Sequence, residues 1–468
     1  LSYDITDWLN ISGRVRIDNS NTKYEQKLYA SSNTTLTEGS TQGYYAIEKP
    51  DESQAYADAL VNINKRFGDY SLVANIGTSI MNNKYDDLSY RGPIREKGIP
   101  NVFNVYDLDN TKKKARQDEW QEQTQSIFAS AEIGWKSMLY LTLTGRNDWA
   151  SQLANSSTSS FFYPSVGLSG VISEMVQLPA FIDYMKVRGS FSSVGMPYPR
   201  NLTSPTYEYD ETNHPIGDLK PERTNSWELG LDMRLFKDFN LGLSWYLANT
   251  FNQTFDPQIS VSSGYSTIYL QTGYVRNTGI ELSLGYNHTW NNNFHWDSNF
   301  TLSHNKNEIK ELVRDYLHPE TGEIINKDRL EIGKLGKAKF ILKEGGTLGD
   351  LYSQSDLKRD NNGMVEIDPS GALVVENNLD DIKLGTVFPK ANLAWNNHFS
   401  WKGISLSALI TARIGGIVYS ATEAAMDQYG VSERSALARD NGGVLLNGRT
   451  LVDAQTYYTA IGSESGLP

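Results

Sequence analysis

Large apolar side chains stand at every second position in many segments of this chain. Leu219–Phe236 is one example, since polar residues or glycine separate the apolar residues Trp227, Leu229, Leu231, Met233 and Leu235. Successive side chains of a β-strand point to opposite faces, so this period of two predicts a strand with one apolar and one polar face. About thirteen runs of this kind follow one another along the chain.

The length of the runs and the connections between them favour a membrane β-barrel. Each run is close to the roughly 9–11 residues that a tilted strand needs to cross a bilayer, whereas strands of soluble sandwiches have about five or six. Tight turns and long polar segments alternate between the runs. We expect short turns at 68–69, 136–137, 237–238, 291–293 and 402–403, and long segments at roughly 18–57, 81–124, 148–161, 193–225, 250–273 and 305–389. This sorting is typical of an outer-membrane barrel with short periplasmic turns and long extracellular loops.

Composition excludes several other classes of protein. The 468 residues include 43 Lys and Arg against 55 Asp and Glu, a formal net charge of −12, which argues against a nucleic-acid partner. The absence of cysteine excludes disulfides, thiolate metal sites and cysteine nucleophiles. No apolar run is long enough for a membrane-spanning helix, and the mean hydropathy of −0.47 agrees with a barrel whose lumen and loops are polar.

Half of the ten tryptophans lie close to the predicted short turns. An amphipathic ring at such a position would lie at the level of the lipid headgroups, and the alternative is an ordinary core or hairpin aromatic residue. The five tryptophans are Trp8, Trp135, Trp290, Trp296 and Trp401. Together they favour an aromatic girdle.

We find no pattern typical of a catalytic, cofactor or metal site. His288, His295 and His304 are spread over two strands without a carboxylate motif that would orient a base, and the zinc spacing H-E-x-x-H does not occur. The acidic segment Ser355–Asp368 lacks the alternating ligand spacing of a calcium loop, so a solvated loop is favoured. We therefore expect a chain that is not an enzyme.

Four segments in a characteristic order resemble the SusC-type (SusC/RagA) TonB-dependent transporters of the Bacteroidota outer membrane. The first segment consists of "FFYPSVGLSGVISEM" and "MKVRGSFSSVGM". The second resembles the family segment L-x-P-E-x-T-x-x-x-E-x-G through Leu219, Pro221, Glu222, Thr224, Glu228 and Gly230. The third is "RNTGIELSLGY", and the fourth consists of "GTLGDLYS" and "LGTVFPKANLAWNNHFSWKGISLSALITARIGG". The family's D-x-N-x-D-G loop is replaced by "DPSGALVVENNLDD", which puts an ion site there in doubt.

The resemblance implies an all-β fold: a large antiparallel transmembrane barrel of about 22 strands when complete. Residues 1–468 would form one partial barrel domain, with the plug, the TonB-contacting segment and the last strands outside it. The implied location is the outer membrane of a Gram-negative cell. The implied partners are a SusD-type lipoprotein, the TonB complex, outer-membrane lipids and lipopolysaccharide, and a dimer of transporter–lipoprotein pairs is a further expectation.

The function implied is active import of oligosaccharides or oligopeptides. Alternatives are a siderophore or vitamin receptor without a lid lipoprotein, a barrel enzyme such as a phospholipase or protease, and a soluble β-rich adhesin. Charged residues on the polar side of the strands are expected to face the lumen, either as hydration and ion pairs or in contact with solute: Arg14, Arg16, Lys186, Arg188, Glu228, Asp232 and Arg234. Tyrosines of the long segments could contact a ligand or partner, or pack between loops: Tyr207, Tyr209, Tyr265, Tyr269 and Tyr274.

Overall fold

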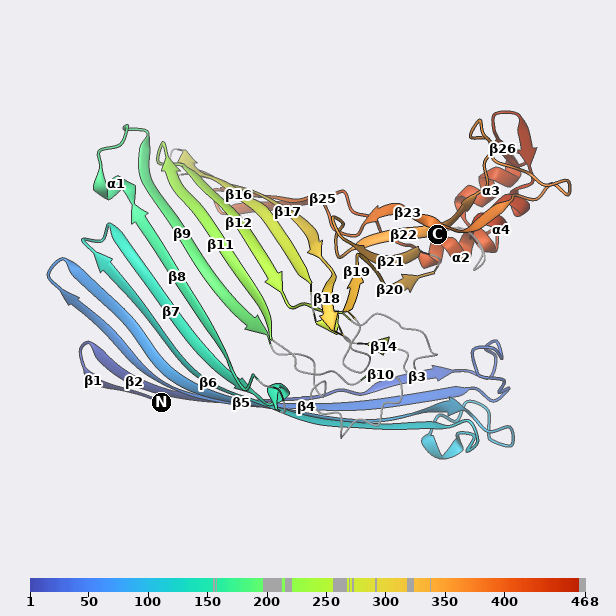
Figure 1. Ribbon diagram of the computed structural model, residues 1–468, viewed down its shortest axis with the longest axis horizontal. Coiled ribbons are helices and arrows are strands. Elements are labelled where there is room, and N and C mark those ends of the chain that lie inside the picture. Colours follow the sequence, from blue (N-terminus) through green and yellow to red (C-terminus); the bar gives the residue numbers. More distant parts are fainter. Residues whose placement is uncertain are drawn as a thin grey trace. The chain divides into compact units, whose positions relative to one another are not determined.

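The computed structural model describes most of the chain as antiparallel β-strands (Figure 1). The described residues are 1–154, 156, 158–196, 213–214, 221–255, 267–268, 270–271, 273–290, 293–317, 324–336 and 338–462. They form two compact units, one of Leu1–Lys136 with Leu141–Ser165 and the other of Ser137–Tyr140 with Val166–Pro468.

The first unit is a meander of long strands in chain order. Its strands are β1 (Ser2–Thr6), β2 (Leu9–Asn21), β4 (Tyr44–Phe67), β5 (Tyr70–Pro93) and β6 (Lys114–Trp135), with β3 (Tyr24–Leu28) paired to the far part of β4. The strands β7 (Leu139–Ala150) and β8 (Phe161–Val171) contribute residues to both units. Two short 3-10 turns, η1 (Val105–Asp107) and η2 (Ser151–Leu153), lie in the connections.

The second unit continues the same architecture. Its large sheet has the order β9 (Ile182–Met196), β11 (Glu222–Leu235), β12 (Phe239–Phe251), β16 (Tyr274–Trp290), β17 (Phe294–Glu311), β24 (Ala391–Trp401) and β25 (Ile404–Ile414). A four-residue helix, α1 (Ile172–Met175), precedes β9. Short pairs join β10 (Asn213–His214) to β14 (Thr267–Ile268) and β13 (Thr254–Phe255) to β15 (Leu270–Gln271).

A smaller sheet and a helical segment follow the ends of β17 and β25. The pair β18 (Val313–Leu317) and β19 (Ile324–Lys327) precedes a four-stranded sheet of β20 (Arg329–Leu335), β21 (Ala338–Lys343), β22 (Asp350–Leu357) and β23 (Val375–Thr386). After β25 come α2 (Ala421–Gln428), α3 (Glu433–Asp440), the hairpin β26 (Val444–Leu446) and β27 (Thr450–Val452), and α4 (Ala454–Gly462). Among the described residues, no helix has the length and apolar character needed to cross a membrane.

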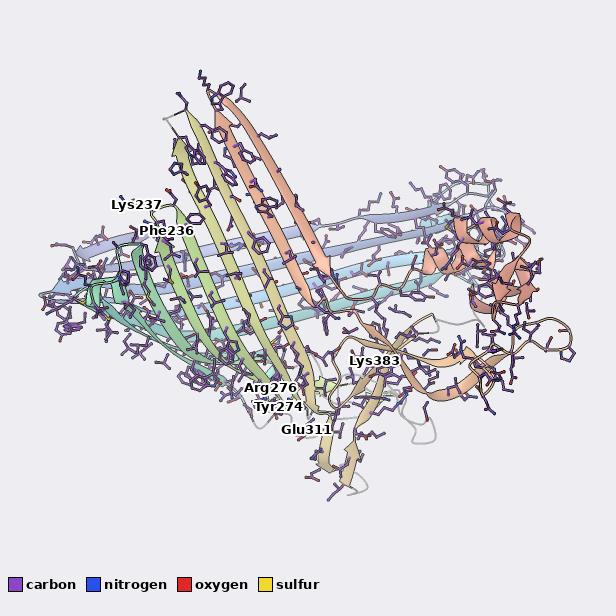
Figure 2. The ribbon with its side chains drawn as sticks, turned by 90° about the horizontal axis from the view of Figure 1, so that it is seen from above. Phe236, Lys237, Tyr274, Arg276, Glu311 and Lys383 are labelled. Carbon is purple, nitrogen blue, oxygen red and sulfur yellow. The ribbon has the colours of Figure 1, made fainter. Side chains whose placement is uncertain are left out.

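Each predicted short turn lies where a hairpin reverses. In the turn between β11 and β12, Phe236 and Lys237 adopt positive φ values of 52° and 68°, which lets the chain reverse within a few residues. Figure 2 shows this turn at one end of the second unit's sheet, and Tyr274, Arg276 and Glu311 at the opposite end. We call these the short-turn end and the long-segment end.

The prediction that the long segments are loops is partly wrong. Residues 44–57, 81–93 and 114–124 belong to β4, β5 and β6, and the segment 305–389 contains a four-stranded sheet. The period of two fades in these parts of the first unit's strands, because polar side chains occupy both faces, whereas backbone hydrogen bonding continues unchanged through 24 paired positions of β4 and β5.

Cross-strand register sorts the side chains of the second unit's large sheet onto an apolar face and a polar face. One rung of the apolar face runs across seven strands through Met185, Met233, Leu241, Leu284, Phe300, Trp395 and Ile410. The adjacent rung of the polar face contains Lys186, Asp232, Gly242, Ser283, Thr301, Ala394 and Thr411. The apolar rung is solvent-exposed in part, with Leu284 44% and Ile410 58% exposed, so these residues are not the inside of a protein core.

Candidate functional site

A four-residue polar cluster stands on the polar face of the second unit. The Arg188 guanidinium donates from Nη1 to Asp232 Oδ2 (2.8 Å) and from Nη2 to Glu228 Oε1 (3.2 Å) and Ser244 Oγ (2.6 Å). Three of the residues that the sequence analysis assigned to the polar side therefore meet in one network that joins β9, β11 and β12.

Gly230 makes room for this cluster. It pairs with Arg188 across the strands, and a Cβ atom built on it would lie 2.4 Å from Arg188 Cζ, far inside van der Waals contact. The motif residues Glu228 and Gly230 thus have distinct roles. Glu228 accepts a hydrogen bond from the guanidinium, and Gly230, which has no Cβ, leaves room for the Arg188 side chain above its own Cα. Sequence reasoning identified the motif but could not identify Arg188 as the side chain that the glycine admits.

A depression of about 700 Å³ adjoins the cluster on the same sheet. Arg188 and Asp232 line one side, Arg413 of β25 lines another, and its floor includes small residues such as Gly242 and Ser283. Hydroxyl, amide and charged groups of this kind offer hydrogen bonds to a hydrated solute or to another polar protein surface.

The other charged residues of the prediction also lie on polar faces. In the first unit, Arg14 donates from Nε to both carboxylate oxygens of Asp58 at 3.1 Å, and Arg16 pairs with Asp18. In the second unit, Arg234 donates to Asn240 at 3.4 Å, and Lys186 shares a rung with Asp232. Ion pairing, one of the two roles weighed from the sequence, therefore occupies Arg14, Arg16 and Arg188.

Aromatic residues gather on the apolar face at the short-turn end. Trp290, Phe294 and Trp401 share one rung, and the next rung toward the long-segment end contains Trp296 and Phe399 with ring centroids 5.8 Å apart. In three places a lysine ammonium lies over a tryptophan ring near a turn: Lys65 over Trp8 (4.3 Å), Lys136 over Trp135 (5.2 Å) and Lys402 over Trp401 (5.3 Å). Such pairs are typical of anchors at a membrane–water interface.

Two of the remaining motif residues, Pro221 and Thr224, make hydrogen bonds at the start of β11. Thr224 Oγ1 lies 2.9 Å from Thr250 Oγ1, and the Pro221 carbonyl accepts from Asn252 Nδ2 at 3.3 Å. Burial raises the pKa of Glu222, which lies at the long-segment end. Leu219 lies outside the described residues.

The Tyr274 side chain contacts residues of its own sheet. Its ring stacks on Phe251 with centroids 4.8 Å apart, and its hydroxyl donates to Asn249 Oδ1 at 3.0 Å. Tyr274 therefore packs against a residue of the neighbouring strand β12. Tyr207, Tyr209, Tyr265 and Tyr269 lie outside the described residues.

One histidine has a carboxylate partner that the sequence spacing did not reveal. His288 Nδ1 lies 2.9 Å from Asp238 Oδ2 across the turn end of β12 and β16. His295 contacts Thr289, and His304 contacts the Lys390 carbonyl, so the three rings do not converge on one site. Asp360 in the acidic segment accepts the backbone N–H groups of its own turn.

The family comparison identifies the architecture. Residues 1–460 match the family described as TonB dependent receptor-like, beta-barrel. The chain belongs to this family. The predicted antiparallel transmembrane barrel in the outer membrane is thereby confirmed, as is the expectation of a receptor barrel in place of an enzyme.

Relatives and solved structures agree with this assignment. The TonB-dependent receptor P39 of Formosa agariphila is 27% identical over 330 residues, which cover 66% of this chain and 29% of that protein. The TonB-dependent receptor P3 of the same organism is 22% identical over 432 residues, 83% of this chain and 41% of that protein. The structure of the RagAB peptide transporter matches 88% of this chain and 46% of that chain with a TM-score of 0.67 at 17% identity. The chain thus spans less than half the length of these relatives.

Proposed function

We propose that this receptor barrel imports oligosaccharides or oligopeptides across the outer membrane, in the manner of a SusC-type transporter. The observation that carries the proposal is the two-faced sheet of an outer-membrane receptor family, with an apolar face for lipid and a polar face built around Arg188, Glu228 and Asp232. On this reading the polar face lines the lumen.

The chemistry of the polar face suits hydrated, hydrogen-bonding cargo. Two carboxylates and a serine hydroxyl already engage the Arg188 guanidinium, so its positive charge is more than offset within the wall. Neighbouring rungs contribute hydroxyl and amide side chains, such as Ser303 and Asn392 in the depression. A wall of this kind offers many weak hydrogen bonds, which favours passage of polar oligomers over tight retention.

The long-segment end provides the surface for a partner. The four-stranded sheet β20–β23 and the segment α2–α4 follow strands that reach this end. Leu330 and Leu342 of the sheet share a buried cluster with residues of β16, β17 and β18, and α3 and α4 pack through Ala438, Ala454 and Tyr458. We propose that a SusD-type lipoprotein docks here and that the TonB complex supplies energy through the rest of the protein. The fold shared with the RagAB peptide transporter supports peptide as one cargo class.

Growth of a deletion strain tests the import proposal. Complementation with the full-length gene should restore growth on an oligopeptide mixture or an oligosaccharide mixture as the sole nutrient source, and a protonophore should abolish the uptake. Restoration of growth only under iron or vitamin limitation would instead favour the siderophore or vitamin receptor.

Purification from the native membrane tests the partner. A SusD-sized lipoprotein in equal amount is expected with the full-length protein in mild detergent. Its consistent absence would contradict the pairing, and hydrolysis of lipid or peptide by the purified protein would contradict a transporter without enzymatic activity.

A further inference from the structure

A groove of about 390 Å³ lies on the apolar face of the second unit's large sheet. Gly189 of β9 is at its floor, and apolar side chains of β8, β9, β11 and β12 surround this glycine, so the absent side chain leaves a hollow between them. These side chains include Leu168, Phe191, Trp227, Leu229 and Trp245. Ser190 and Glu228 also contribute to the lining, but strand alternation turns their side chains to the polar face, where Glu228 accepts the hydrogen bond from Arg188.

Cross-strand register explains why the groove forms at this place. Gly189 pairs with Leu229, which pairs with Trp245 on its other side, and in the adjacent rung of the same face Phe191 pairs with Trp227. The Phe191 and Trp227 rings lie with centroids 4.7 Å apart and form a wall beside the space above Gly189. Trp227 is 54% and Leu229 is 59% exposed, so the groove is open in the described part of the chain.

The groove lies in the half of the sheet nearer the long-segment end. Leu229 and Trp227 are six and eight residues from Leu235 at the short-turn end of β11, which corresponds to about 15 Å and about 20 Å of height at a strand tilt of about 40°. An outer-membrane barrel has an apolar band about 25 Å tall, with short turns on the periplasmic side and long segments outside the cell. With the apolar face in lipid, as proposed above, the groove opens onto the acyl chains of the outer leaflet.

Basic side chains lie on the same face just beyond the groove. Arg223 is twelve residues from Leu235, and Lys306 is twelve residues from Phe294 at the short-turn end of β17, so both lie at about 30 Å of height, outside the apolar band. Register places Arg276 of β16 between them on this face, at the long-segment end (Figure 2). Four cations and two carboxylates make up this basic level: Arg223, Arg276, Lys306 and Lys310 with Glu308 and Glu311.

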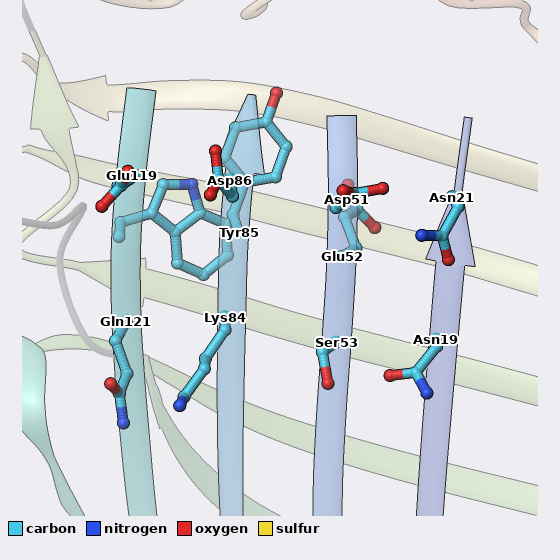
Figure 3. A pocket seen from close by; sticks show the side chains of 11 residues that line it. Asn19, Asn21, Asp51, Glu52, Ser53, Lys84, Tyr85, Asp86, Glu119 and Gln121 are labelled. Atoms are coloured by element: carbon cyan, nitrogen blue, oxygen red, sulfur yellow. The ribbon is translucent and has the colours of Figure 1, made fainter. Parts of the chain in front are cut away.

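The first unit has the opposite charge on the corresponding rows. Beyond Ala57 of β4, its apolar-face rows reach a rung of Asn21, Asp51, Asp86 and Glu119 (Figure 3). These three carboxylates line an open depression of about 670 Å³, in which Lys84 of the adjacent rung is the cation. An anionic headgroup would be repelled there, so the basic level near Gly189 is a local feature of the second unit.

A lipid with acyl chains and a phosphorylated headgroup fits both parts of this surface. Within a bilayer the hydrophobic effect does not favour one apolar contact over another, so close packing in a shaped groove is what holds a particular acyl chain. Arginine and lysine form charge-assisted hydrogen bonds with phosphate, which supply the specificity for the headgroup.

The outer leaflet of a Gram-negative outer membrane consists mainly of lipid A, in which several acyl chains are attached to one phosphorylated disaccharide. Arg223 and Lys306 are three strands apart, or about 14 Å, with Arg276 on the strand between. A disaccharide headgroup with several chains covers a width of this order, whereas a two-chain phospholipid presents one phosphate to one part of the basic level.

We propose that the Gly189 groove and the basic level of Arg223, Arg276 and Lys306 together bind one molecule of lipid A, with an acyl chain in the groove and the phosphorylated headgroup on the cations. This proposal rests on the placement of the apolar face in lipid made under the proposed function, and it is independent of the cargo that the barrel imports.

Native mass spectrometry of the full-length protein in detergent, mixed with purified lipid A, measures this binding. We expect one lipid A to bind about tenfold more tightly than dephosphorylated lipid A or phosphatidylethanolamine. Gly189→Leu fills the groove and should weaken lipid A binding about fivefold, because the new side chain takes the place of part of the acyl chain. The variant should fold, since a Cβ on Gly189 would lie 3.3 Å from the flexible Leu229 side chain, and heat-modifiable migration in gels verifies the folded barrel.

Arg223→Gln/Lys306→Gln tests the headgroup contact without altering the groove. It should reduce the preference for lipid A over its dephosphorylated form about tenfold. Lys49→Gln/Lys84→Gln is its matched control, because it removes two cations from the same face of the first unit. Ala129→Leu is the matched control for Gly189→Leu, because it enlarges an exposed apolar-face residue of β6 six residues from Trp135. Both controls should bind lipid A as the unchanged protein does.

Four outcomes would overturn the proposal. They are equal binding of lipid A and its dephosphorylated form by the unchanged protein, unchanged binding by folded Gly189→Leu, equal weakening in the site variants and their controls, and a change of oligomeric state in Gly189→Leu with lipid binding intact. The last outcome would assign the groove to contact between two copies of the chain. Greater destabilisation by Ser283→Arg than by Leu284→Arg would instead overturn the placement of the apolar face in lipid, and the lipid site with it.

Discussion

Arginine placed at two adjacent positions of β16 tests which face of the sheet meets lipid. Leu284 and Ser283 are neighbours in sequence, and strand alternation puts them on the apolar and the polar face. Leu284 is six residues from Trp290 at the short-turn end, about 20 Å of strand and about 15 Å of height, which is near the middle of an apolar band of about 25 Å.

The expected cost follows from this depth. A charged side chain on the lipid face near the bilayer midplane costs about 2–4 kcal/mol, so Leu284→Arg should shift the folding equilibrium by about 30- to 700-fold. Ser283→Arg introduces the same side chain on the polar face and removes one exposed hydrogen bond to Asn299 at 3.2 Å. We expect it to change stability by about 1 kcal/mol or less.

Denaturant unfolding in phospholipid vesicles, followed by tryptophan fluorescence, measures both variants against the unchanged protein. Heat-modifiable migration in gels gives an independent measure of the folded barrel. Equal destabilisation by the two substitutions would refute the assignment of the faces, and a larger effect of Ser283→Arg would reverse it.

Two more predictions concern packing and charge. Gly230→Ala should destabilise the barrel by about 1–3 kcal/mol because its Cβ would collide with Arg188, whereas Gly333→Ala, with no atom within 4 Å, should be nearly neutral in the same unfolding assay. Asp381→Asn should destabilise the four-stranded sheet by about 1.5–3 kcal/mol, measured as faster proteolysis within 329–386, because Arg329 donates to both carboxylate oxygens at 2.6 and 2.9 Å. The hydrogen bond from Arg329 is the largest of the contacts that lower the pKa of Asp381. The stability that the Asp381 carboxylate contributes is therefore present above pH 3.8 and is lost as the pH falls below that value. The unchanged protein and Asp381→Asn should converge in stability in acid, and a difference that stays constant with pH would contradict this reasoning.

The sequence predicted the parts of the fold that lipid constrains. Where one face of a strand meets acyl chains, every second residue is apolar, and the hairpin turns between such strands were located correctly. In 44–57 polar residues occur on both faces of β4, so the strand retains its backbone ladder without the alternation that would reveal it.

The missed helices did carry a local signal. Ser420 caps α2 by accepting the Glu423 N–H, and Ser432 caps α3 by accepting the Ser435 N–H. The Ser-x-x-Glu spacing before α2 matches the sequence pattern of a capping box, but the period of two does not reveal it.

The candidate site was only partly accessible to sequence reasoning. Alternation alone put Arg188, Glu228 and Asp232 on a polar face, because that depends on position within a single strand. Their convergence, and the fit of Arg188 over Gly230, depend on the register between strands 40 or more residues apart, which no local pattern encodes.

The unbroken pairing of β4 with β5 has a consequence for amide exchange. One half of this hairpin carries polar residues on both faces and the other half has an apolar face for lipid, yet a single hydrogen-bonded ladder runs through both. Thermal opening that begins at the open end of the hairpin, where Tyr44 pairs with Pro93, can propagate inward only until it reaches amides that water cannot solvate. Deuterium uptake along β5 should therefore fall sharply around Ile80. The residue at which it falls would show how deep the protein lies in its membrane.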